Sequence, residues 1–259
     1  MSVCVKTLNG YTHIVRVGER DSVRHLKESI EERLGMPCEE QRLSFGGNVM
    51  DDDYKSISDY GVGPDNSVHM LVQSRSGMCP ITFIDKRSFD PAFDYDFTDK
   101  DDGGKSFYRG GERHYRPCGW MRRAIKVRGR FVDDEDGRGD KWLGEPGYRE
   151  KSSEGEWPVS YHGTPKENSD SITTSGYLLS KSWRFKYGRG IYSAPSITTA
   201  AGYAKSFPFK GGDYQLVFQN RVCPRDLEKV SAQKTGCGEY WVTKNQDNIR
   251  PYGICTRKV

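Results

Sequence analysis

A histidine, two tyrosines and a glutamate in the second half of the chain are the residue types best suited to chemistry. Three of them stand in the short stretches 157–164, 188–192 and 238–242, and the second tyrosine follows at position 203. A glycine lets a ligand approach the backbone closely. Polar residues gathered at strand ends and turns form a possible site for a small ligand. The candidates are His162, Gly163, Thr164, Tyr192, Tyr203 and Glu239.

Taken one at a time, these residues have ordinary structural explanations. His162 could be an ordinary polar residue at the end of a buried strand. The tyrosines could simply pack in the core, and Glu239 could be a carboxylate on the surface of a strand. Only their combination favours a shared site.

The surrounding pattern predicts the elements that would position them. Hydrophobic spacing and glycine or proline boundaries indicate two helices, a tight turn and two strands. Tyr203 is expected on the second helix, and Glu239 at the start of a final strand. The predicted elements are a helix over 168–175 that ends at Gly176, a turn at 188–190 into strand 191–193, a helix from 197 to about 207, strand 214–222 and a loop over 225–237.

Composition limits the class of protein. Only 34% of the 259 residues are hydrophobic and the mean hydropathy is -0.80, which predicts a soluble protein with a lean core. No apolar run approaches the ~20 residues that span a bilayer, and the N-terminus lacks the layout of a signal peptide. We expect no membrane partner and an intracellular location, cytoplasmic or nuclear.

The seven cysteines predict neither disulfides nor a metal site. Their number is odd, they are scattered, and no Cys-x-x-Cys pair occurs. Such a pattern fits a reducing compartment. The five histidines are not clustered with cysteine or aspartate, so no metal is expected.

Charge is distributed unevenly and helps to mark domains. Residues 1–77 carry a net charge of -3, residues 78–104 a net charge of -4, and the remainder a net charge of +11. Within the remainder, residues 105–131 hold nine basic side chains against Glu112 alone. This segment suggests weak binding of nucleic acid. The alternative is a solvated face of a strand over 124–128, because no array of stacking aromatics accompanies the charge.

The first 77 residues read as a small α+β domain. Valines alternate with polar residues near the N-terminus, and Asn9-Gly10 is a strong hairpin signal. Apolar residues at helical spacing follow Asp21-Ser22, which predicts a helix from residue 23 that Gly35 ends. Two further strands are expected at 43–45 and 68–72.

This segment resembles ubiquitin closely. The resemblance implies a ubiquitin-like β-grasp domain over residues 1–77. Ser44 stands where ubiquitin has its recognition isoleucine, and the segment 73–78 lacks the diglycine needed for conjugation. A fused, non-conjugated docking module is therefore favoured over a conjugated one. The matching motifs are Val5-Lys6-Thr7-Leu8-x-Gly10, Gln41-Arg42-Leu43, Phe45-x-Gly47, Ser58-Asp59-Tyr60 and His69.

Residues 78–112 are interpreted as an acidic, aromatic arm. Asp residues and Gly103-Gly104 are typical of a linker. Four aromatics fall within the nine residues 89–97, which is too many for a linker that is freely solvated. We expect the arm to pack along the second domain, which runs over 113–259.

The second domain resembles the ADP-ribosyltransferases of the poly(ADP-ribose) polymerase class, also called diphtheria-toxin-like. The motifs are His162-Gly-Thr, then Gly188-x-Gly-Ile-Tyr192 with Tyr203 eleven residues on, then Glu239-Tyr240. The resemblance covers roughly residues 155–259. It implies a split β-sheet around an NAD cleft, with NAD as substrate and no metal.

The resemblance also implies residue roles. His162 would hydrogen-bond the ribose of NAD, and Gly163 would hold the nicotinamide amide through its backbone with support from Thr164. Tyr192 and Tyr203 would sandwich the nicotinamide ring. Glu239 would bind the ribose hydroxyl and stabilise the positive charge that develops as nicotinamide leaves. His162, Tyr192 and Glu239 form the predicted catalytic set.

Two departures from that family modify the expectation. Ala200 replaces the serine that contacts the amide, which bears on NAD affinity. The loop before Glu239 is short, and Cys237 stands where arginine-modifying relatives have Glu or Gln. Transfer of single ADP-ribose units to a protein or nucleic acid is therefore favoured, with arginine a poor acceptor. The alternatives are an inactive scaffold that binds NAD, ADP-ribose or a partner, and a nucleic-acid binder.

Overall fold

A computed structural model of the protein describes residues 1–7, 11–34, 36, 38, 41–72, 80–131, 139–145, 149–181 and 186–259. The chain divides into two compact units. The first is built around Met1–Cys79, and the second around Pro80–Asp90, Asp96–Glu145 and Arg149–Val259. The predicted boundary at residue 77 lies outside the described residues.

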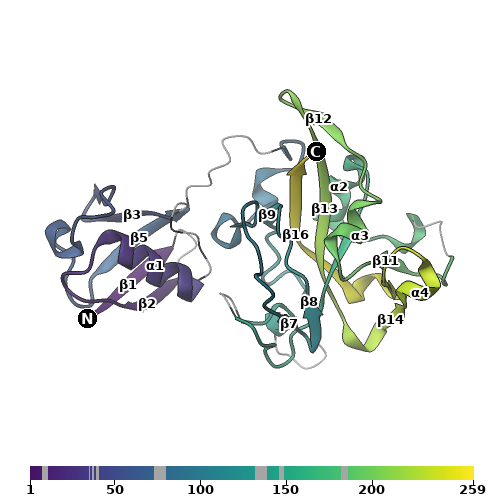
Figure 1. Ribbon diagram of the computed structural model, residues 1–259, viewed down its shortest axis with the longest axis horizontal. Coiled ribbons are helices and arrows are strands. Elements are labelled where there is room, and N and C mark those ends of the chain that lie inside the picture. Colours follow the sequence, from purple (N-terminus) through teal and green to yellow (C-terminus); the bar gives the residue numbers. More distant parts are fainter. Residues whose placement is uncertain are drawn as a thin grey trace. The chain divides into compact units, whose positions relative to one another are not determined.

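The first unit is a five-stranded sheet with one helix, drawn in purple and blue in Figure 1. Its strand order is β2-β1-β5-β3-β4, and β1 and β5 run parallel. The unit also contains the short 3-10 helix η2, Ile57–Tyr60. Its strands and helix are β1 Ser2–Thr7, β2 Thr12–Arg16, α1 Val23–Leu34, β3 Gln41–Phe45, β4 Asn48–Val49 and β5 Ser67–Val72.

Local sequence signals explain this unit. The Ser22 hydroxyl accepts a hydrogen bond from the His25 amide at 3.2 Å, so Ser22 caps α1 as predicted. Val23, Leu26 and Ile30 are buried on one face of the helix. They pack on an aliphatic core that also includes the buried residues Val3, Val5, Val15, Leu43 and Val68. The hairpin signal at Asn9-Gly10 and the helix stop at Gly35 lie outside the described residues.

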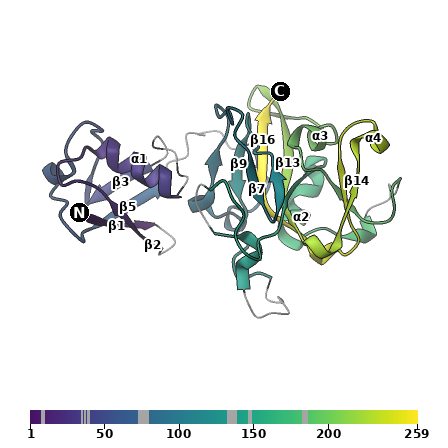
Figure 2. The same ribbon diagram turned by 60° about the horizontal axis from the view of Figure 1, so that its bottom comes forward.

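The second unit contains three separate sheets. Figure 2 shows the long antiparallel strands β13 Gly212–Val222 and β16 Ile249–Lys258 side by side at its centre. The main sheet has the order β10-β13-β16-β9-β6, and β12 pairs with β13. A second sheet has the order β11-β15-β14, and β7 pairs with β8. The remaining strands are β6 Tyr95–Asp96, β7 Phe107–Arg109, β8 Glu112–His114, β9 Met121–Ala124, β10 Val159–Gly163, β11 Ile191–Ser193, β12 Phe207–Phe209, β14 Leu227–Val230 and β15 Tyr240–Thr243.

Helices in this unit are short. The helix predicted over 168–175 is present as α2, Ser169–Ser175, and Gly176 follows it with a positive φ of 78°. The helix predicted from 197 to about 207 is wrong in length, because α3 covers only Ile197–Ala201. Tyr203 lies in the turn after α3, and strand β12 begins at Phe207. The last helix is α4, Ala232–Thr235.

The elements around Glu239 also differ from the prediction. The expected loop over 225–237 contains strand β14 and helix α4. Glu239 directly precedes β15, but β15 is not the final strand, since β16 follows it. The short segment 244–248 separates β15 from β16, which belong to different sheets.

The arm is ordered by aromatic burial. Phe97 and Phe107 are 9% and 1% exposed. The Phe97 amide donates to the Trp120 carbonyl at 3.0 Å, and the Gly119 amide donates to the Phe97 carbonyl at 2.8 Å. The part of the arm around Phe97 and Phe107 therefore packs within the second unit, whereas Pro91–Tyr95 belongs to the first unit.

A buried carboxylate ties the loop after Gly139 to the main sheet. Glu156 is 4% exposed, and Oε1 lies 2.5 Å from Arg149 Nη2, 2.9 Å from Arg221 Nη1 and 3.5 Å from Arg109 Nε. Burial, followed by the charge of Arg149, lowers the pKa of Arg109 to about 10. Burial would raise the pKa of Glu156, but the hydrogen bond from Arg149 and the charge of Arg221 hold it below its usual value.

Several basic side chains of residues 105–131 are used inside the fold. Arg116 pairs with Asp102, Arg122 donates to Gln219 at 2.5 Å, and Arg130 donates to the Thr173 carbonyl at 2.7 Å. The strand predicted over 124–128 is displaced, since β9 covers Met121–Ala124 and ends where the predicted strand begins. Buried and exposed residues still alternate over 125–128. The charge of this segment therefore serves the structure rather than forming one free basic face.

Candidate functional site

A cavity of about 660 Å³ opens in the second unit beside the end of β10. Elements that are distant in sequence meet there: β10, the segment before β11, the end of α3 and the segment before β15. The residues that line it are Tyr161, His162, Gly163, Thr164, Pro165, Asn168, Lys186, Tyr187, Gly190, Tyr192, Ser193, Ala194, Ala200, Tyr203, Lys205, Thr235, Cys237 and Tyr240.

His162 is held in one orientation at this cavity. Its Nδ1 lies 2.6 Å from the carbonyl oxygen of Tyr192, so Nδ1 carries the hydrogen and donates it. Burial lowers the pKa of His162, although the bond to Tyr192 opposes the shift. The neutral ring therefore leaves Nε2 as a hydrogen-bond acceptor. No side chain among the described residues bonds to Nε2, which suits it to a ligand hydroxyl.

Gly163 is required by packing. A Cβ at this position would clash with the carbonyl oxygen of Ala200 in α3. The close approach seen here is that of the helix backbone, and a backbone contact between Gly163 and a ligand stays a prediction. Thr164 is 5% exposed, and its hydroxyl accepts a hydrogen bond from Asn168 at 2.9 Å.

Five tyrosines line the cavity: Tyr161, Tyr187, Tyr192, Tyr203 and Tyr240. Tyr192 accepts from the Tyr187 amide at 2.8 Å and donates to the Gly188 carbonyl at 2.7 Å, which closes the turn before β11. Tyr203 is 50% exposed, and its hydroxyl contacts that of Tyr240. The ring of Tyr240 lies 6.5 Å from that of Tyr192 and 6.1 Å from that of Tyr203.

Tyr240 is the aromatic residue that the sequence did not single out. It is 8% exposed and is the shared neighbour of the predicted pair Tyr192 and Tyr203. Its hydroxyl also lies 2.6 Å from the Cys237 sulfur. Tyr240 directly follows Glu239 in the sequence. Which of these two side chains faces Tyr192 and Tyr203 was decided by the orientation of the chain at the start of β15.

Glu239 is not among the described residues that line the cavity. Its Oε1 accepts a hydrogen bond from the indole nitrogen of Trp241. The structure thus brings His162, Gly163, Thr164, Tyr192 and Tyr203 together and leaves the Glu239 carboxylate on another partner. Its catalytic role stays a prediction.

Ser193 and two lysines are further lining residues that sequence reasoning missed. Ser193 is 5% exposed, and its hydroxyl has no hydrogen-bond partner in the described part of the chain. An unpaired buried hydroxyl is costly and rare. Ser193 follows Tyr192 in the recognised motif, but only the tertiary structure places it at a cavity.

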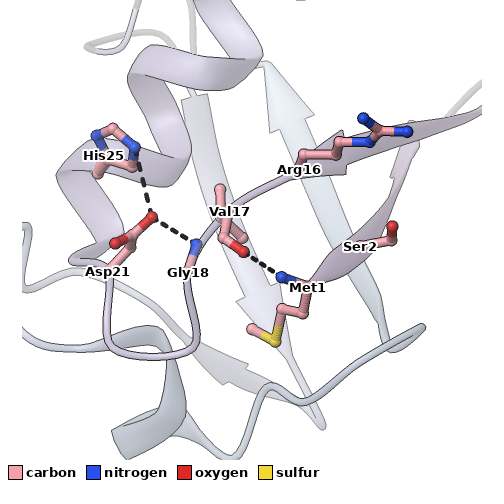
Figure 3. Close-up of a pocket in the computed structure, with 7 residues that line it drawn as sticks. All are labelled: Met1, Ser2, Arg16, Val17, Gly18, Asp21 and His25. Atoms are coloured by element: carbon pink, nitrogen blue, oxygen red, sulfur yellow. Dashed lines mark hydrogen bonds and ion pairs between the residues drawn. The ribbon is translucent and has the colours of Figure 1, made fainter.

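A second pocket, of about 470 Å³, lies in the first unit and is drawn in Figure 3. The Met1 ammonium donates to the Val17 carbonyl at 2.6 Å, and the Gly18 amide donates to Asp21 at 2.7 Å. His25 Nε2 lies 3.4 Å from the same carboxylate. Four of its lining residues are thus held by contacts within the pocket wall: Met1, Gly18, Asp21 and His25.

Metal chemistry finds no support in the described ranges. No group of three or more His, Cys, Asp or Glu side chains there has a geometry that could hold a metal ion. The six cysteines at described positions are free thiols.

Within the same ranges, none of the helices has the length and apolar character that crossing a membrane requires.

Comparison with known proteins identifies the first unit. The model of the ubiquitin family matches residues 3–75. Ubiquitin-like protein NEDD8 of Dictyostelium discoideum is 36% identical over 78 residues, which are 30% of this chain and all of that protein. Ubiquitin-like protein 4A-B of Oncorhynchus mykiss is 37% identical over 81 residues, 30% of this chain and 53% of that protein.

Ubiquitin-like protein 4B of Homo sapiens is 38% identical over 73 residues, 28% of this chain and 41% of that protein. The chain thus spans about half the length, or less, of these 4A-B and 4B relatives. The five-stranded sheet, the parallel β1–β5 pair and these matches agree, and the chain belongs to the ubiquitin family through its first unit.

Proposed function

We propose that the second unit is an NAD-dependent ADP-ribosyltransferase that moves single ADP-ribose units onto a protein or nucleic-acid acceptor. The observation that carries the proposal is the fixed imidazole of His162 in an aromatic cavity of about 660 Å³. Such a cavity has the size of a small-molecule site. The order and spacing of the three motifs supplied the expectation of NAD.

The residues would divide the work between binding and chemistry. Nε2 of His162 accepts a hydrogen bond from a ribose hydroxyl, because its Nδ1 hydrogen is already committed to Tyr192. Tyr192 and Tyr203 offer aromatic faces to the cationic nicotinamide ring. Cleavage of the nicotinamide bond leaves positive charge on the ribose, and a nearby carboxylate stabilises that charge.

The proposed mechanism requires the Glu239 carboxylate to change its hydrogen-bond partner. Glu239 bonds to Trp241, so transfer requires the Glu239 side chain to leave the indole and turn to the ribose. This observation favours a second candidate function, a scaffold that binds NAD or ADP-ribose and transfers nothing.

Labelled NAD separates the two candidates. The wild-type chain is expected to bind NAD and to release nicotinamide or label an acceptor. Glu239→Gln should lower that rate on the order of 100-fold with little change in affinity, because the charge acts on the transition state. His162→Ala should weaken binding itself.

Calorimetry measures NAD affinity, and release of labelled nicotinamide measures the rate. Together they distinguish a loss of binding from a loss of catalysis. No binding at millimolar NAD would remove both candidates. Binding without turnover in any acceptor mixture leaves the scaffold. Full activity of Glu239→Gln contradicts the assignment of that residue.

For the first unit we propose a docking module for a protein partner, one that is not conjugated to other proteins. A half-buried Ser44 pairs with the exposed His69 on β5 and with Val49 on β4. A serine there offers little apolar surface. Ser44→Ile is expected to create binding to an isolated ubiquitin-receptor domain that the wild type lacks, measured by chemical-shift titration. Equal binding by both proteins would contradict this explanation.

A further inference from the structure

The lining of the cavity carries an unbalanced charge. Its 18 residues include Lys186 and Lys205 and no aspartate or glutamate. His162 adds no charge near neutral pH, because burial lowers its pKa. Walls of one sign focus the electrostatic field inside a cleft and favour a ligand of the opposite sign. The cavity is therefore suited to an anion.

Both lysines are available to a ligand. Each is exposed, and neither forms an ion pair within the described part of the chain. Other lysines of this unit do: Lys229 lies 2.6 Å from Glu112, and Lys244 lies 2.9 Å from Glu228. Lys186 and Lys205 thus lack the acidic neighbours that Lys229 and Lys244 have.

The two ammonium groups reach the cavity from different elements. Lys186 stands before β11, and Lys205 follows the turn after α3. Lys186 Nζ lies 5.3 Å from the centre of the Tyr187 ring, and Lys234 Nζ lies 5.9 Å from the same ring. A third cation therefore stands close to the lining.

Aromatic and neutral polar groups make up the rest of the lining. His162 Nε2 accepts hydrogen bonds, and the buried Ser193 hydroxyl still lacks a partner within the described ranges. A ligand that satisfies both and also uses the lysines needs hydroxyls, a flat ring and negative charge. A nucleoside diphosphate combines these features.

We infer that Lys186 and Lys205 bind the diphosphate of the ligand and make the cavity selective for nucleoside diphosphates over free nicotinamide, which is neutral. This inference rests on the proposed function for the choice of NAD, but the charge of the lining supports it independently. It assigns the two lysines to binding and no step of the transfer to them.

Calorimetry with three ligands tests the assignment on the full chain. The ligands are NAD, ADP-ribose and nicotinamide, and the variants are Lys186→Met, Lys205→Met and both together. Lys126→Met is the matched control, because Lys126 is exposed and does not line the cavity. Tryptophan emission verifies that each variant is folded.

Each cavity variant should weaken ADP-ribose and NAD roughly fivefold, as expected for one contact between unit charges in water. The double variant should lose roughly 25-fold, and added salt should reduce the difference. Nicotinamide affinity and the Lys126→Met control should not change.

Two outcomes separate the inference from the proposed function. Unchanged ADP-ribose affinity in the double variant overturns the lysine assignment, even where nicotinamide and NAD still bind. Lysine-dependent binding of ADP-ribose with no binding of nicotinamide or NAD supports the assignment and overturns the proposed transferase. Failure of all three ligands to bind the wild type overturns both.

Discussion

The two units of this chain are stabilised in different ways. The first buries an aliphatic cluster, and the buried polar side chains among its described residues within 1–72 are Lys27, which pairs with Asp53 at 2.5 Å, and Gln41, which donates to two backbone carbonyls. The second buries charged and amide side chains inside its sheet, among them Glu156, Arg221, Arg250, Gln219 and Asn220.

Arg250 is an example of a buried charged side chain in the second unit. It is 7% exposed, and its guanidinium lies 4.3 Å from the ring centre of Trp157, 4.7 Å from that of Phe131 and 5.0 Å from that of Trp142. Buried cations need such partners, because an unpaired buried charge is costly. A unit that depends on paired charges should respond to acid and to charge removal more strongly than one that depends on aliphatic burial.

The largest expected effect is that of Glu156→Ala. Removing the carboxylate leaves three arginines without their shared partner, and breaking a buried ion pair costs about 3–5 kcal/mol. All five tryptophans follow residue 119, so tryptophan emission during urea unfolding reports the second unit alone. Glu154→Ala, at an exposed position, is the control. A loss below about 1 kcal/mol would show that the ion cluster contributes little.

Ile30→Ala should destabilise the first unit by about 2–5 kcal/mol, because it removes a fully buried side chain from the aliphatic core. Tryptophan emission should not register the change. Hydrogen exchange of the α1 amides measures it, with the exposed Glu32→Ala on the same helix as control. Equal destabilisation of the tryptophan-reported transition would mean that the two units unfold together.

Ser22→Ala removes the cap of α1 and should cost about 1 kcal/mol. The same amide-exchange measurement reads it. The effect should be largest in the first turn of the helix, because that is where the unpaired amide lies. Uniform exchange along α1 would contradict a local capping role.

The smallest expected effect is a dependence on pH. The pKa of Glu156 is held below its usual value of 4.5, so the folded second unit binds fewer protons than the unfolded chain as the pH falls toward 4.5. The stability that this carboxylate contributes is present above the unfolded pKa and is lost as the pH falls through the folded one. The tryptophan-reported urea midpoint should therefore decline between about pH 6 and pH 3. Glu156→Gln should flatten the decline, and an equal slope in that variant would assign it to other groups.

Sequence reasoning performed differently on the two units. Alternating valines, Ser22 before a helix and the ubiquitin motifs gave the first unit correctly, because its structure follows from local patterns. In the second unit the same reasoning found α2 and β13 but extended the second helix past Ala201. Gly202 and the pairing of Phe207–Phe209 with β13 end that helix, and such tertiary pairing has no signature in a local window.

The candidate site was predicted in part. His162, Gly163, Thr164, Tyr192 and Tyr203 were named from residue types and from the resemblance to the ADP-ribosyltransferase motifs, and all five line one cavity. Lys186, Ser193, Lys205 and Tyr240 were missed, because surface lysines and a strand serine have no distinctive pattern in a sequence. Glu239 was named, and its bond to Trp241 was not foreseeable.

The sequence by itself determined the ubiquitin-like unit, the order of the motifs and the types of the candidate site residues. Hydrophobic periodicity, helix caps and turns depend on a few neighbouring residues, so they can be recognised directly in the sequence. Only the tertiary structure decided which side of β15 faces the tyrosines and which cations at the cavity remain unpaired. It also explains why position 163 requires a glycine. These depend on strand register and on contacts between segments tens of residues apart, and a shift of one residue along a strand exchanges its two faces.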